Sequence, residues 1–265
     1  FPEAEAFAGP VKPVLTFSHF YCEGTSGRYD LVNDQTFDRI QSDKASKDTS
    51  DNIGHYSTTP SDYVTLTLKA TDNASTFARI CGELNNSSPY EVKSSGLIHL
   101  VYDPQGDYTQ TFNGRTHSFS GRIEVKRGTI RSDAGTTWSN VPKVVIWPGA
   151  TFEISETNNV ANPLPDLRQL FVAKGGTVKV PEGVTLTATV NYDGTWQPAG
   201  ACSGDWLVGG GAVTAQTFSP SELTWANARG GDWSMAANWM PEEVMYSGSY
   251  VMNHSWAVFP CAPLV

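Results

Sequence analysis

Positive charge is scarce in this sequence of 265 residues. Lysine and arginine number 18 against 27 aspartates and glutamates, which gives a formal net charge of −9. Nucleic-acid binding depends on basic side chains that displace phosphate counterions, and an anionic membrane surface attracts the same side chains. The composition therefore argues against a nucleic-acid partner and against attachment to an anionic membrane surface.

Long apolar runs are also missing. The sequence has neither a stretch of about 20 apolar residues that could span a membrane nor a charged-then-apolar leader. It begins with Phe1 rather than methionine. We interpret the chain as a processed protein or a piece of a larger one, and we expect no membrane insertion in this segment.

Cysteine is present but without metal-binding spacing. Cys22, Cys81, Cys202 and Cys261 contain no C-x-x-C pair, so we expect neither a zinc site nor a thioredoxin-like motif. No metal or cofactor is predicted. The even number fits two disulfides in an exported protein, for which three pairings exist. The same four cysteines could equally well be unpaired buried thiols.

The helical period is absent, and a strand pattern takes its place. No stretch longer than about 10 residues shows the 3.6-residue apolar period of a helix. The pattern apolar-x-apolar-x-x-Gly instead occurs four times, at Ile123–Gly128, Val144–Gly149, Leu170–Gly175 and Val178–Gly183. Apolar side chains two residues apart share one face of a strand, and glycine permits the tight turn that ends it.

The spacing of these copies favours a solenoid. The glycines of the first three copies are 21 and 26 residues apart, and one solenoid repeat takes roughly 20–30 residues. The fourth glycine follows after 8 residues, so we interpret the third and fourth copies as two strands of one repeat unit. Weaker copies are predicted at Ile98-x-Leu100-x-x-Asp103 and Trp206-x-Val208-x-x-Gly211.

We therefore expect an all-β protein whose centre is a right-handed parallel β-solenoid with irregular capping segments. The alternative is a β-sandwich of antiparallel strands. We divide the chain into an irregular N-terminal cap at 1–55, the solenoid at 56–215 and a Trp-rich C-terminal segment at 216–265. Within the solenoid, strict alternation over 63–69 and 184–190 predicts strands with outward threonines.

Two stretches resemble a known family. Ser118–Arg131 resembles the autotransporter-associated β-strand repeat, and Leu223–Trp239 is similar to the Thr-Trp…Gly-Gly…Trp-Ser…Ala-Asn-Trp stretches that punctuate such proteins. The resemblance implies a right-handed parallel β-helix that is exported to a bacterial surface and acts in adhesion, and it supplies no catalytic residues. Residues 1–55 and the tail after Pro241 depart from the family's pattern.

Three tryptophans are candidate ligand-binding residues. Trp138, Trp147 and Trp196 each lie beside a Gly, Pro or Asn turn, and tryptophan faces stack well on sugar rings. An exposed row of them would bind a polysaccharide or another glycan. The alternative is that they fill the core at the ends of strands and under loops.

An enzyme on a β-helix scaffold is the competing interpretation. Glu124 and Glu153 occupy outward positions at matching places in their strands, and glycoside hydrolysis needs two carboxylates about 5–10 Å apart. An ordinary solvated strand face would look the same. A lyase would need a basic side chain, for which the candidates are His55 with Tyr56, His99 with Tyr102, and Arg115 with His117; we expect His99 at the surface.

The sequence thus predicts a non-catalytic, secreted or cell-surface module for adhesion or glycan contact within a larger bacterial protein. The alternative is a polysaccharide lyase or glycoside hydrolase, and a third interpretation is a purely structural spacer. Converging carboxylates or a metal would indicate the enzyme. An exposed aromatic platform would indicate the binding module. A spacer would show neither of these features.

Overall fold

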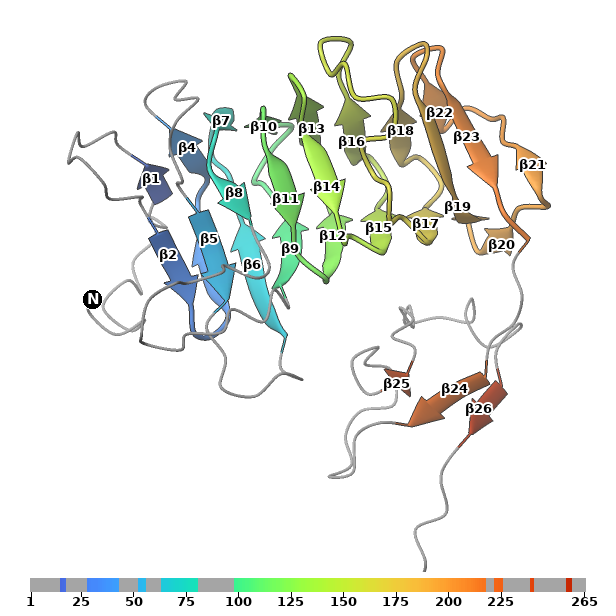
Figure 1. Ribbon diagram of the computed structural model, residues 1–265, viewed down its shortest axis with the longest axis horizontal. Helices are drawn as coiled ribbons and strands as arrows, with labels where there is room; N and C mark the ends of the chain where they lie inside the picture. Colours follow the sequence, from blue (N-terminus) through green and yellow to red (C-terminus); the bar gives the residue numbers. More distant parts are fainter. Residues whose placement is uncertain are drawn as a thin grey trace, which may run out of the picture.

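The computed structural model describes residues 15–17, 28–42, 52–55, 63–80, 98–217, 222–225, 239–240 and 256–258. Within these ranges the regular secondary structure consists of strands, and no helix occurs. Most strands stack side by side in parallel along one axis (Figure 1). The described protein is therefore all-β, and its stacked parallel strands are compatible with a β-solenoid.

Two long sheets form the body of the stack. The ten-stranded sheet contains, in spatial order, β3 (Gln35–Phe37), β6 (Val64–Leu68), β9 (Ile98–Tyr102), β12 (Arg122–Val125), β15 (Lys143–Ile146), β17 (Gln169–Val172), β19 (Thr185–Tyr192), β23 (Ala212–Ala215) and β21 (Gly200–Ala201), with β20 (Thr195–Trp196) also paired to β19. The six-stranded sheet contains β7 (Ala74–Thr76), β10 (Thr109–Asn113), β13 (Thr129–Asp133), β16 (Thr151–Ile154), β18 (Thr177–Lys179) and β22 (Leu207–Val208). From β9 to β18, each strand of the ten-stranded sheet is followed along the chain by one of the six-stranded sheet.

Shorter sheets complete the described strands. Parallel pairing joins β2 (Arg28–Leu31), β5 (Asn52–His55) and β8 (Arg79–Ile80), then β11 (Thr116–Ser118) and β14 (Thr137–Ser139), and also β1 (Leu15–Phe17) and β4 (Ile40–Ser42). A last sheet contains β24 (Glu222–Trp225), β25 (Trp239–Met240) and β26 (Trp256–Val258).

Antiparallel pairing is rare among the described strands. It joins β20 to β19, β21 to β23 and β25 to β24, whereas the other strand pairs of the two long sheets are parallel. A β-sandwich would need antiparallel pairs throughout. The sandwich alternative is therefore wrong for the described stack.

The repeated sequence pattern sets the register of the ten-stranded sheet. Ile123, Val144 and Leu170, the first residues of the first three copies, lie opposite one another on β12, β15 and β17 and are buried. The fourth copy supplies β18, which belongs to the six-stranded sheet. The third and fourth copies thus lie in different sheets, as expected for two strands of one repeat unit.

The two weaker copies have a different register from the expected one. Leu100, not Ile98, lies opposite Ile123, so this copy is displaced by two residues and its apolar positions stay on the inner face. In the last copy Leu207 packs against the core, whereas Val208 is 41% exposed. The inward assignment of Val208 is therefore wrong.

Described strands on both sides of residue 56 belong to common sheets. β3 pairs with β6, and β5 pairs with β8, so the parallel stack begins ahead of the start expected for the solenoid. At the other end, β23 closes at Ala215, and the later strands β24, β25 and β26 form a sheet of their own.

Alternation along the strands builds the core. Val64, Leu66 and Leu68 of β6 are buried while the threonines between them are half-buried. In β19 the same alternation leaves Thr185 and Thr187 exposed, which confirms the predicted outward threonines. Burial of the inward side chains stabilises the stack by roughly 25 cal/mol per Å² of apolar surface removed from water.

Alanine at two glycines of the pattern should separate backbone strain from steric clash. Gly128 and Gly149 both have positive φ, 62° and 76°, and alanine there costs about 1–2 kcal/mol. A Cβ on Gly128 would clash with the Tyr108 carbonyl oxygen, whereas one on Gly149 would have no heavy atom of the described residues within 4 Å apart from those of its two chain neighbours. We expect Gly128→Ala to lower the urea midpoint of unfolding more than Gly149→Ala. Equal midpoints would contradict the described turn geometry.

Candidate functional site

Trp138, the first of the three candidate tryptophans, lies in the core. Its side chain is 0% exposed, and its ring stacks on His117 with centroids 4.2 Å apart. The indole Nε1 donates to Ser132 Oγ at 3.1 Å. Trp138 therefore presents no ring face to a ligand, and its prediction as a binding residue is corrected to a core residue.

Trp147 lies on the outer face of the ten-stranded sheet, directly after β15. Its side chain is half-buried, and its Nε1 donates to Glu124 Oε1 at 2.9 Å. The ammonium of Lys126 lies 5.8 Å from the ring centroid, close enough for a cation–π interaction. The indole is thus held on the outer surface of β12 and β15.

Trp196 reaches the same outer face from β20. Its backbone lies opposite Asn191 of β19, and its half-buried ring meets the outward ring of Phe171 edge to face, with centroids 5.3 Å apart. The structure therefore places two of the three predicted tryptophans on one side of one sheet.

A row of outward side chains on the same face is buried. Val101, Glu124, Val145, Phe171 and Asn191 occupy equivalent positions on β9, β12, β15, β17 and β19, and each is less than 10% exposed. We call this set the outer row. Its three apolar members lie outside the core cluster, so this sheet buries side chains on both of its faces.

Cationic side chains surround the one carboxylate of the outer row. Arg122 Nε lies 3.3 Å from Glu124 Oε2, and Lys126 Nζ lies 3.7 Å from Glu124 Oε1. Lys143, which is 4% exposed, places its Nζ 5.7 Å from the centroid of the Phe171 ring. Cationic side chains of β12 and β15, and of the residue after β12, thus lie beside the rings of Trp147 and Phe171.

The candidate pair of catalytic carboxylates is divided between two sheets. Glu124 belongs to β12 of the ten-stranded sheet, whereas Glu153 belongs to β16 of the six-stranded sheet, where it accepts from Lys179 Nζ at 2.9 Å. Hydrolysis requires both groups to flank one glycosidic bond. Their matching positions in the sequence therefore do not correspond to a shared face.

The histidines proposed for a lyase are buried. His99 does point outward, but Tyr63 stacks on it with centroids 4.3 Å apart, and only 6% of it is exposed. Its Nδ1 accepts from the Arg122 backbone N–H at 3.2 Å. The expectation of a surface histidine at this position is therefore wrong. His55 and His117 are 2% and 0% exposed, Tyr102 is a core residue, and Tyr56 lies outside the described residues.

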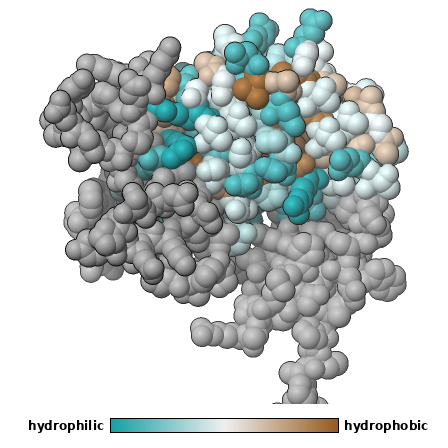
Figure 2. Space-filling view, in the orientation of Figure 1, coloured by the Kyte–Doolittle hydropathy of each residue, from teal (hydrophilic) through white to brown (hydrophobic). Residues whose placement is uncertain are grey.

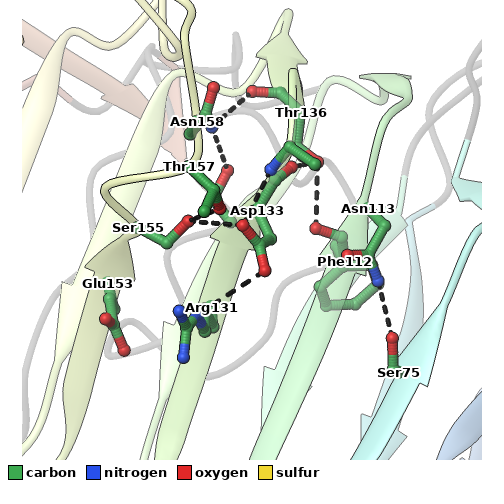
Figure 3. A network of polar contacts seen from close by, with 12 residues as sticks. Ser75, Phe112, Asn113, Arg131, Asp133, Thr136, Glu153, Ser155, Thr157 and Asn158 are labelled. Atoms are coloured by element: carbon green, nitrogen blue, oxygen red, sulfur yellow. Dashed lines mark hydrogen bonds and ion pairs between the residues drawn. The ribbon is translucent and has the colours of Figure 1, made fainter.

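A polar network at the carboxyl ends of β10, β13 and β16 has a structural role (Figure 3). Asn158 lies in the loop after β16, and its Nδ2 donates to Ser132 Oγ at 3.2 Å and to the Thr136 carbonyl at 3.0 Å. The Thr136 hydroxyl donates to the Phe112 carbonyl at 2.9 Å. These hydrogen bonds attach the loop to the neighbouring strands. The amide of Asn158 and the hydroxyl of Thr136 are thus already hydrogen-bonded within the protein.

The rest of the described surface offers little apolar area. Figure 2 shows mostly hydrophilic or intermediate residues on the described part of one face, with small separate hydrophobic areas. Among the described residues, the exposed large apolar side chains are Val32 and Val208. Trp147 and Trp196 are two of the half-buried aromatic residues of the described stack.

Comparison with known protein families, curated proteins and solved structures found no match to this chain. In the described ranges, no group of three or more His, Cys, Asp and Glu side chains is placed to hold a metal ion. No helix there has the length and apolarity needed to cross a membrane. Cys202 is half-buried, and burial raises the pKa of its thiol; Cys22, Cys81 and Cys261 lie outside the described residues.

Several residues of this face were not among the sequence candidates, namely Arg122, Lys126, Lys143 and Phe171. A signal for Lys126 exists in the repeated pattern. Lys126 and Trp147 each follow directly after the second apolar residue of their copies, and equivalent positions of stacked parallel strands are neighbours. Superimposing the copies, rather than inspecting each one, would have placed Lys126 beside Trp147.

The stability of the core should depend on the protonation of His117. Burial, with smaller effects of Arg79 and Arg115, lowers its pKa from 6.5 to about 3, and its Nδ1 accepts from the Ile80 N–H at 3.1 Å. Between these pH values the unfolded chain binds a proton that the folded protein does not. The free energy of unfolding should therefore decrease by about 1.4 kcal/mol for each pH unit lost in this range.

The variant His117→Gln tests this dependence. Its free energy of unfolding, measured by denaturant titration between pH 7 and pH 5, should change less with pH than that of the parent protein. This range lies above the ordinary pKa values of Asp and Glu, so carboxylates contribute little to the slope. Equal slopes for both proteins would rule out His117 as the cause.

Proposed function

We propose that this chain is a non-catalytic module that binds a polysaccharide or another glycan through the outer face of its ten-stranded sheet. The binding surface contains Trp147, directly after β15, and Trp196, opposite the last member of the outer row. The module is exported, and it is displayed at the surface of a bacterium or secreted as part of a larger protein. The resemblance of Ser118–Arg131 to autotransporter-associated repeats supports this location.

The scaffold of the proposed module is a right-handed parallel β-solenoid. Its support is the parallel ladder from β3 to β23 and the regular alternation between the two long sheets. Connections between parallel strands of one sheet are almost always right-handed, because a twisted strand returns to its sheet most easily in that sense.

The observation that carries the binding function is the placement of Trp147 and Trp196. Both rings are half-buried, so each keeps part of its surface while its orientation is fixed by contacts with Glu124 or Phe171. A rigid, amphipathic ring stacks on the apolar face of a sugar at little entropic cost. A purely structural spacer has no need of such a pair.

The enzyme alternative loses the support of its carboxylate pair. Glu124 and Glu153 lie on different sheets and each is paired with basic side chains. We therefore place the hydrolase or lyase second, and a turnover assay decides between the two functions.

Binding to a glycan array should weaken in Trp147→Ala and in Trp196→Ala. Each loss of a stacking ring should reduce affinity roughly two- to tenfold, whereas Val208→Ala, which removes an exposed apolar group from the six-stranded sheet, should bind like the parent. Thermal unfolding of all variants checks that the fold persists. Release of reducing sugars or unsaturated uronates from any bound polysaccharide would overturn the non-catalytic function.

A further inference from the structure

We propose that Asp193 and Gly194 form a site of spontaneous covalent modification, at which the aspartate rearranges to isoaspartate. The two residues form the loop between β19 and β20, since Tyr192 lies opposite Thr195 on either side of them. They are also the one Asp-Gly pair of the whole sequence. The inference concerns the chemistry of this turn, so it goes beyond the proposed binding function.

The hairpin explains why this reactive pair is present. A two-residue hairpin loop with positive φ at both positions favours Asp-Gly, because both residues tolerate the left-handed conformation. The φ angles are 47° at Asp193 and 79° at Gly194. The Asp193 side chain is exposed, and the Gly194 N–H donates to no group of the described residues. The carboxyl group and the neighbouring backbone nitrogen are therefore both available for reaction.

The reaction needs only these two groups and water. The Gly194 nitrogen attacks Asp193 Cγ, the new N–Cγ bond forms as a Cγ–O bond breaks, and the amide proton leaves with that oxygen as water. One water molecule then opens the cyclic imide. Cleavage of the new bond restores aspartate, whereas cleavage of the original peptide bond leaves the main chain running through Cγ. Glycine favours ring closure because no Cβ crowds the attacking nitrogen.

The position of the turn allows the local opening that ring closure requires. β20 has two residues and, among the described strands, pairs with β19 alone. The Asp193 N–H donates to the Val172 carbonyl at 2.9 Å, and the Gln197 N–H donates to the Val190 carbonyl at 2.8 Å. Short elements at the margin of a sheet open at a lower free energy than its centre, so the loop can reach the reactive conformation without unfolding of the stack.

The modification should displace Trp196. Isoaspartate adds one methylene group to the main chain of the loop, and the loop length fixes the register of a hairpin. Asn191 can then no longer remain opposite Trp196, and the edge-to-face contact of Trp196 with Phe171 should be lost. Under the proposed function, ageing of the protein would therefore remove one of the two binding tryptophans.

The chain contains an internal control in its one Asn-Gly pair, Asn113 and Gly114. Asparagine forms the same cyclic imide with loss of ammonia, so Asp193→Asn places two Asn-Gly pairs in one protein. Asn113 is 9% exposed and its Nδ2 donates to Ser75 Oγ at 2.6 Å. The Gly114 N–H, which is the attacking group, donates to the Asp133 carbonyl at 3.5 Å. Gly114 also has a positive φ of 59°, so the two pairs differ mainly in burial and hydrogen bonding.

The test incubates the full chain and its Asp193→Asn variant in neutral buffer at physiological temperature for several weeks, followed by peptide mapping with mass spectrometry that distinguishes isoaspartate. In the variant, position 193 should deamidate at least about tenfold faster than Asn113, because the Asn113 amide and the Gly114 N–H must first lose their hydrogen bonds. In the parent, isoaspartate should accumulate faster at Asp193 than at the exposed Asp72, which precedes an asparagine.

The variant Asp193→Gly separates the modification from its consequence. It keeps a Gly-Gly pair, which the same turn accepts, and it has no carboxyl group to form the ring. Glycan binding should decrease on ageing in the parent and stay constant in Asp193→Gly. Absence of isoaspartate at Asp193, or equal deamidation of the two Asn-Gly pairs, would overturn the modification site. Isoaspartate at Asp193 in a protein that binds no glycan when fresh would support the site and overturn the proposed function.

Discussion

The structure depends on the in-register stacking of equivalent residues in parallel strands. Each strand of the ten-stranded sheet places its inward apolar residues on those of its neighbour, as Ile123, Val144 and Leu170 do. Neighbouring strands lie about 4.8 Å apart, so the apolar side chains form continuous columns. A slip of one residue would turn every inward side chain outward, and glycines in the left-handed conformation, such as Gly128, help to prevent it by ending each strand at the same place.

The same register creates the proposed site. Lys126 and Trp147 are 21 residues apart in the sequence, but they become neighbours because each follows the same position of its strand. Glu124 joins them from the outer row and is held by hydrogen bonding and charge. The inward positions are committed to the core, so the chemistry of the sheet is confined to its outward positions. Those positions bring together side chains that no short motif contains.

The interior shows how the stack accommodates polar groups. Trp138 stacks on the neutral ring of His117, and Ser132 and Asn158 supply hydrogen bonds around it. Deeper toward the N-terminal end, Gln110 bonds to both the N–H and the carbonyl of Ile40. Buried polar groups are costly when unpaired, and these side chains pair with the Trp138 indole N–H and with backbone groups. Their polarity therefore serves folding, although in the sequence they look like candidates for chemistry.

By itself, the sequence determined the strand content and, for the four full copies of the repeated pattern, the inward and outward faces, because alternation and turn glycines are local properties. The tertiary structure decided which outward residues meet. Glu124 and Glu153 look equivalent in the chain but lie on different sheets, Trp138 is drawn into the core, and Trp147 and Trp196 share one face. Local periodicity states on which side of a strand a residue lies. Which sheet the strand joins, and what covers it, depends on contacts between residues that are distant in the sequence.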